Sequence, residues 1–107
     1  MNLLDNAIPF AFDEATQAAH VVIAGVATKK IYIWRLFLWS DGTVDVTIKD
    51  ETGNLVGPLS FVAQSKLHLD LEGNPPQPWF VCHAGEDFII DLGAAIQVSG
   101  AGLYSIV

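Results

Sequence analysis

Three histidines and one cysteine are the side chains of this sequence best suited to metal binding, base catalysis or nucleophilic attack. His20, His68 and His83 lie far apart, without the four-residue spacing by which a helix presents two zinc ligands on one face. A site assembled from distant strands would want a His-x-His pair near a glutamate, which the sequence lacks. We therefore expect no metal ion and no cofactor, and histidines that face solvent or form hydrogen bonds.

The other candidate catalytic groups also have simpler structural explanations. Cys82 and His83 are adjacent, and neighbouring residues of a strand point to opposite faces, so a buried structural thiol is expected. The acid pairs Asp50-Glu51 and Glu86-Asp87 fall at predicted turns, where solvated carboxylates are common. A glycosidase pair would need a cleft that this chain length can hardly build. No phosphate-binding glycine loop or Gly-x-Ser-x-Gly elbow occurs, and we expect no enzymatic activity.

Length and composition narrow the classes of protein. A chain of 107 residues and 11.6 kDa is the size of one domain. Hydrophobic residues make up 51% and charged residues 16%, where ordinary domains carry roughly a quarter charged, so a folded chain with an apolar surface is expected. The formal charge of -7 repels nucleic-acid phosphates and anionic lipids, which disfavours both as partners.

The same sequence predicts a soluble protein made in a reducing cytoplasm. The single cysteine cannot close an intramolecular disulfide. The first twelve residues lack the basic region of a signal peptide. Apolar runs such as Leu36 to Trp39 are far shorter than the roughly 20 residues that a membrane-spanning helix needs.

The elements that would position these residues follow a period of two. Val44, Val46 and Ile48 alternate with polar residues, and the pair Asp41-Gly42 favours a tight hairpin. The alternation and the turn signals predict eight strands, at about residues 20–27, 31–39, 43–50, 55–61, 66–72, 79–82, 87–92 and 96–107.

Eight short strands at roughly ten-residue spacing predict an all-β fold: a sandwich, a jelly roll or a small barrel. We expect a single β-sandwich domain of antiparallel strands over residues 20–107. Residues 1–19 are less patterned and predict an irregular N-terminal arm, or a short helix from Asp13 to Ala19 with Asp13 as its cap. An arm could also reach a neighbouring subunit.

Aromatic residues are the remaining functional lead. The strand from Ile31 to Trp39 is largely apolar on both faces, although a domain core needs only one. The second face must be covered by the opposite sheet, the N-terminal arm or another subunit. An interface with another copy or with a partner protein would use Trp34, Arg35, Phe37, Trp39, Trp79 and Phe80. A central strand with a local twist, or a glycan-binding face of Trp34, Trp39 and Trp79, remain alternatives.

A series of short motifs also resembles a known family. In chain order they are Gly25, Lys29-Lys30-Ile31, Val44-Asp45-Val46, Leu55-Val56-Gly57-Pro58-Leu59, Pro78-Trp79-Phe80, Gly85-Glu86 and Gly102-Leu103-Tyr104. This order is similar to that of small tailed-bacteriophage virion proteins, the head decoration or cement proteins. The chain departs from the family pattern at Pro78, which replaces a glycine, in the longer Pro75-Pro76 loop, and over the first nineteen residues.

The resemblance implies a jelly-roll-like sandwich on the outer capsid surface of a virion. It further implies a homotrimer that braces neighbouring subunits of the major capsid protein. A tail or neck component of the same fold remains an alternative. A carbohydrate-binding module is a further alternative. An enzyme of the cupin type is the least favoured of the functions considered.

Overall fold

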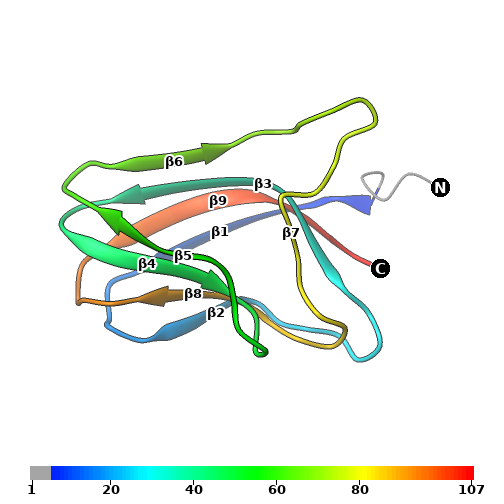
Figure 1. Ribbon diagram of the computed structural model, residues 1–107, viewed down its shortest axis with the longest axis horizontal. Helices are drawn as coiled ribbons and strands as arrows, with labels where there is room; N and C mark the ends of the chain where they lie inside the picture. The colour runs from blue at the N-terminus through cyan, green and yellow to red at the C-terminus, as the bar shows by residue number, and fades with distance from the viewer. Residues whose placement is uncertain (1–5) are drawn as a thin grey trace.

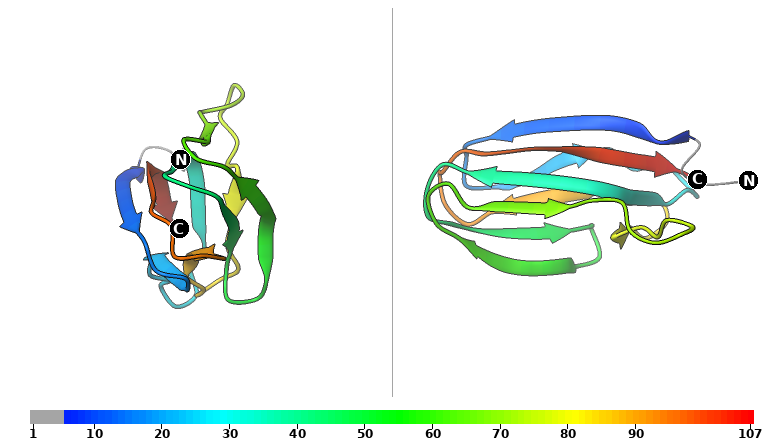
Figure 2. Two further views of the ribbon diagram at one scale, coloured as in Figure 1. Left: turned by 90° about the vertical axis from the view of Figure 1, so that its left-hand side faces the viewer. Right: turned by 90° about the horizontal axis from the view of Figure 1, so that it is seen from above.

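The computed structural model describes residues 6–107, which fold into two antiparallel sheets packed face to face (Figures 1 and 2). The strands are β1 (Ile8–Glu14), β2 (Ala19–Ile23), β3 (Ile31–Ser40), β4 (Val44–Lys49), β5 (Asn54–Phe61), β6 (Lys66–Leu69), β7 (Phe80–Val81), β8 (Phe88–Leu92) and β9 (Val98–Ile106). The predicted all-β sandwich is therefore confirmed, with nine strands instead of eight. Residues 6–107 hold no helix with the length and apolar character to cross a membrane.

The strand order is that of a jelly roll. The first sheet runs β1-β9-β3-β6, with β7 also paired to β3, and the second runs β2-β8-β4-β5. The chain crosses from one sheet to the other between β1, β2, β3 and β4, and again between β5 and β6, β7 and β8, and β8 and β9. Each sheet thus joins strands from both ends of the sequence, as expected for two interleaved Greek keys.

The core lies between the sheets and consists of aliphatic and aromatic side chains. In β4, Val44, Val46 and Ile48 point inward while Asp45, Thr47 and Lys49 point outward, as the alternation predicts. The opposite sheet contributes Ile31, Ile33, Leu36 and Leu38 of β3, all fully buried.

The N-terminal region differs from its prediction. Residues 8–14 form a regular strand, paired with β9 from Ile8 opposite Tyr104 to Glu14 opposite Val98, so the expected irregular arm or capped helix is corrected there. The physical reason is the alternation of Phe10 and Phe12, which pack against the core from the sheet edge. Residues 1–5 lie outside the described residues, and the hypothesis that they reach a neighbour stays a prediction.

Glycines of β9 make room for these two phenyl rings. A Cβ atom on Gly102 would lie 2.8 Å from Cε1 of Phe10, and one on Gly100 would lie 2.6 Å from Cζ of Phe12. Both distances are shorter than van der Waals contact, and each Cβ would lie closer still to a backbone carbonyl oxygen of β3, that of Arg35 or Phe37. Only glycine therefore lets β1, β9 and β3 pack this closely.

A β-bulge in β3 reverses which residues face the core. The pairing of β3 with β9 shifts between Ile33 and Arg35. Before the shift Ile31 and Ile33 point inward, and after it Leu36 and Leu38 do. The extra residue of the bulge is Trp34.

Candidate functional site: the outer face of the first sheet

The side of the first sheet that points away from the core carries an unusual set of side chains, which we call the outer face. Its residues form three rows across β1, β9, β3 and β6: Asp13, Ser99, Trp39 and Lys66; Ala11, Ala101, Phe37 and His68; and Pro9, Leu103, Arg35 and Asp70. The centre of every row is apolar or small, except at Arg35, and charged groups stand toward the edges. A sheet face with an apolar centre of this kind is typical of a surface that another molecule covers.

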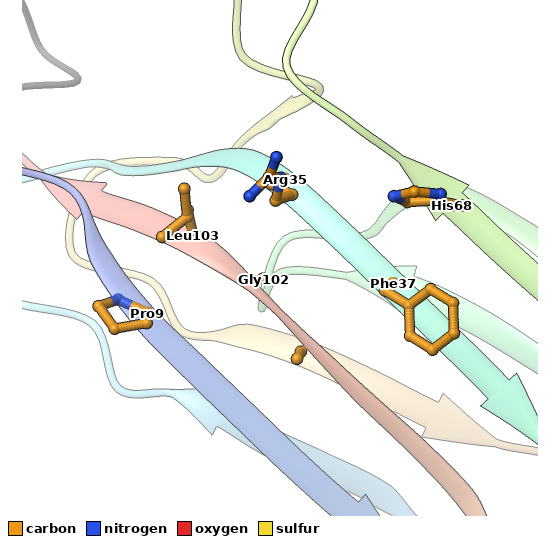
Figure 3. Close-up of a pocket in the computed structure, with 7 residues that line it drawn as sticks. Pro9, Arg35, Phe37, His68, Gly102 and Leu103 are labelled. Atoms are coloured by element: carbon orange, nitrogen blue, oxygen red, sulfur yellow. The ribbon is translucent and has the colours of Figure 1, made fainter.

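A shallow hollow of about 330 Å³ lies in the middle of the outer face (Figure 3). It is lined by Pro9, Arg35, Phe37, His68, Ala101, Gly102 and Leu103. The hollow lies over β9, where Ala101 and Gly102 contribute almost no side-chain volume. Its wall on the β3 side is the ring of Phe37, which meets the imidazole of His68 edge to face at 5.8 Å between centroids.

The hollow carries one ion pair at its rim. Nε and Nη2 of Arg35 each lie 2.6 Å from Oδ1 of Asp70, and Nε2 of His68 lies 3.9 Å from the other carboxylate oxygen. The backbone amide of Leu71, followed by the guanidinium of Arg35, lowers the pKa of Asp70. The side chains of Arg35, Asp70 and His68 are about half exposed, so the ion pair contributes little to stability in the single chain.

The outer face of the second sheet is different in kind. Its side chains include Asp45, Thr47, Lys49, Ser60 and Asp91, together with Val21 of β2, which is 54% exposed. Ser60 donates a hydrogen bond to Asp45 at 3.1 Å, and Lys49 lies 4.0 Å from Asp91. Because these polar groups pair with each other and the first sheet holds the hollow beside Phe37, the first sheet is the better candidate for an interface.

The six residues predicted to form an interface lie in different parts of the structure. Arg35, Phe37 and Trp39 lie side by side on the outer face, and the Phe37 side chain is 36% exposed. Trp79 lies beyond β6, where its indole donates a hydrogen bond to the carbonyl of Asp70 at 2.6 Å. Phe80 of β7 is partly buried and packs against the core.

Trp34 requires a correction. Its side chain is only 2% exposed, so it is neither a surface anchor nor part of a glycan platform in the single chain. Strict alternation would group Trp34 with Leu36 and Leu38, but the bulge separates it from these core residues, and the expectation of an exposed anchor is wrong. Its indole stacks on Tyr32 and donates a hydrogen bond to Ser105, both within the same chain.

A second polar cluster, which the sequence did not reveal, joins two loops at one end of the sandwich. Asp50, after β4, is 1% exposed and accepts four hydrogen bonds: from the backbone amides of Thr52, Gly53 and His83 and from Nδ1 of His83, at 2.7 to 3.1 Å. Thr52 in turn donates to Glu86 at 2.8 Å. The cluster fastens the β4–β5 turn to the segment before β8.

These hydrogen bonds determine the ionisation of the cluster. Burial alone would raise the pKa of Asp50, but the bonds from His83, Gly53 and Thr52 outweigh it and lower the pKa to about 2. The same carboxylate raises the pKa of His83 above its ordinary value of 6.5. Asp50, His83 and Glu86 are donor types that a divalent cation accepts, and one atom of each lies within 4.8 Å of the others. Both Asp50 oxygens are already saturated, so the arrangement is complete as a structural tether.

Cys82 lies beneath this cluster and is 1% exposed. Burial, reinforced by the carboxylates of Asp50, Glu86 and Asp87, raises the pKa of the thiol to about 12. The thiolate required of a nucleophile is thus suppressed at neutral pH, in keeping with the expected structural thiol.

A scan against known protein families finds no match to this sequence, and a search of curated proteins finds no relative. Support for a function therefore comes from the residues of the chain and from its resemblance to the decoration proteins.

Proposed function

We propose that this chain is a non-enzymatic structural protein of a tailed-bacteriophage virion. In this role it is a head decoration protein that binds the outer capsid surface and braces neighbouring subunits of the major capsid protein. The observation that carries the proposal is the jelly-roll strand order, which agrees with the fold that the resemblance implies, together with an outer sheet face suited to joining copies of the chain. A decoration protein needs rigid contact surfaces, and the motif resemblance supplies the capsid as partner.

Charge and symmetry agree with this role. A formal charge of -7 per chain discourages adhesion to free or packaged DNA and keeps the unassembled protein in solution. Several copies joined in one assembly bind a repetitive shell tightly even when each contact is weak, because later contacts form at high effective concentration. The resemblance implies a homotrimer for that assembly.

The proposal is tested with capsid shells assembled from the major capsid protein of the same genome. Purified protein is mixed with expanded shells, and bound protein is measured after sedimentation. We expect saturable binding, a fixed ratio to the major capsid subunits, and added density on the outside of the shell in electron cryomicroscopy. A genome without a capsid gene, or shells that bind no protein, would refute the proposal. Antibody labelling of intact virions at the tail instead of the head would favour a tail or neck component.

Glycan binding is the second candidate, because Phe37 and Trp39 present aromatic rings beside the polar groups of Arg35 and His68. We expect a glycan array to show no binding. Binding that Trp39→Ala abolishes and Trp79→Ala retains would replace the capsid proposal, since only the first variant changes the outer face.

A further inference from the structure

The shape of the outer face is complementary to a second copy of the same face. Its β3 column is high, with the long side chains of Arg35, Phe37 and Trp39. The neighbouring β9 column is low over two of its three positions, Ser99 and Ala101. A ridge and a trough of the same length thus run side by side along the middle of the sheet.

The charges at the two edges of the face are also complementary. In the first row, Asp13 stands on β1 at one edge, and Lys66 stands on β6 at the other. Asp13 is an ionised acceptor, since hydrogen bonds from Gln97 and Ser99 lower its pKa. The two residues are separated by the full width of the sheet and cannot pair within one chain.

We propose that the outer face packs against the same face of a second copy of this chain. The two copies are related by a twofold axis that lies parallel to the strands, between β9 and β3. This rotation exchanges β9 with β3 and β1 with β6 and keeps each row. The ring of Phe37 then enters the hollow above the partner's Ala101, and Trp39 covers the partner's Ser99. Asp13 meets the partner's Lys66, and the reciprocal pair forms at the other edge.

The alternative twofold axis, perpendicular to the strands, fits less well. It would place each column on itself, so that Phe37 meets the partner's Phe37 while Ala101 meets the partner's Ala101. The ridges would hold the sheets apart and leave the troughs empty, against the close packing that protein interfaces require. The parallel axis fills both troughs and pairs both edge charges, as an isologous contact should.

This inference does not rest on the capsid proposal. A twofold contact gives a dimer in place of the homotrimer that the resemblance implies, whereas the decoration role requires only that several copies be joined. Solution mass therefore tests the contact, and capsid binding separately tests the decoration role.

The first experiment measures mass by light scattering after size-exclusion chromatography, from low micromolar to near-millimolar protein. We expect the mass of two chains of 11.6 kDa. Ala101→Arg places a charged side chain in the hollow, on an exposed position outside the core, and should give the mass of one chain. Thr47→Arg is the matched control, on a central strand of the second sheet, and should remain a dimer. A wild-type mass of one or three chains, or a dimeric Ala101→Arg, would overturn the proposal.

A charge exchange then tests the predicted axis. Asp13→Lys and Lys66→Asp each place two like charges together at both edges, and each should weaken dimerisation at least about threefold. The double variant restores opposite charges and should dimerise within about twofold of the wild type. Circular dichroism confirms folding, which matters because Asp13 also accepts bonds from Gln97 and Ser99. A dimer insensitive to both single variants, or a double variant as weak as either, would exclude this axis.

Discussion

The indole nitrogen of Trp34 donates a hydrogen bond to Oγ of Ser105 at 2.9 Å, and both side chains are shielded from solvent. Tyr32 stacks on the same indole, with 6.2 Å between ring centroids and 20° between planes. Trp34 is therefore a fixed part of the single chain, and the proposed dimer contact uses the outward rings of Phe37 and Trp39 instead.

The buried pair can be tested by a double-mutant cycle. Ser105→Ala leaves the indole N–H without its acceptor and should lower the free energy of unfolding by about 1–3 kcal/mol in urea titrations. In a Trp34→Phe background, which has no such donor, the same change should cost measurably less. Equal costs in both backgrounds would show that the hydrogen bond does not stabilise the fold.

Acid stability should depend on Asp50. Its folded pKa of about 2 lies below its ordinary value of 3.8, so the unfolded chain takes up the proton first as the pH falls. The stabilisation, about 2 kcal/mol at neutral pH, is present above pH 4 and is lost as the pH falls through about 2. Asp50→Asn should lower the free energy of unfolding at pH 7. It should also weaken the dependence of that free energy on pH between pH 4 and pH 2, as measured by denaturation curves. A pH dependence in this range identical to that of the wild type would contradict the role of Asp50.

His83 should act in the opposite direction. Its folded pKa is raised, first by the hydrogen bond to Asp50, so its stabilisation is complete below pH 6.5 and is lost as the pH rises through the folded value. The difference in stability between wild type and His83→Ala should thus be larger at pH 5.5 than at pH 9. A difference that stays constant over this interval would mean that the imidazole only fills space.

Cys82 should be unreactive in the native protein. With its side chain buried and its pKa near 12, almost no thiolate meets solvent at pH 8. Ellman's reagent should release one equivalent of colour only after denaturant unfolds the chain. Stoichiometric reaction within minutes under native conditions would show that the loop above Cys82 opens freely.

The close approach of β1 and β9 should tolerate no added methyl group. Gly102→Ala forces the new Cβ onto the backbone carbonyl oxygen of Arg35 in β3 and against the ring of Phe10, and it should lower the free energy of unfolding by about 1–3 kcal/mol. Gly53→Ala is the control, since a Cβ there meets nothing within 4 Å, and should change stability by less than about 0.5 kcal/mol. Similar losses in both variants would attribute the effect to glycine in general and not to this contact.

Alternation located the strands with one clear buried face. The stretch predicted at about residues 43–50 is β4, Val44–Lys49, because its aliphatic residues all point inward. The strand β1 was missed, since Pro9 and Ala11 have low strand propensity and Asp13 resembles a helix cap. Only the pairing with β9, which lies at the other end of the sequence, makes this segment a strand.

The candidate site was predictable where it followed the period of the strand. Alternation put Arg35, Phe37 and Trp39 on one face, and they share the outer face. It put Ile31 and Ile33 on the same face, whereas the bulge leaves these two in the core. The burial of Trp34 follows from a β-bulge that no local sequence pattern predicts. The contact of Asp50 with His83 joins residues 33 positions apart, so no spacing rule could have found it.

The position of β9 between β1 and β3 also constrains how the protein is made. The first sheet is incomplete until β9, residues 98–106, pairs with both β1 and β3. Among the described strands of this sheet, β1 pairs with β9 alone. On the ribosome, β1 therefore stays unpaired, with Phe10 and Phe12 exposed, until residues 98–106 have left the exit tunnel. The first sheet thus forms only after β9 has been synthesised, although β1 precedes every other described strand.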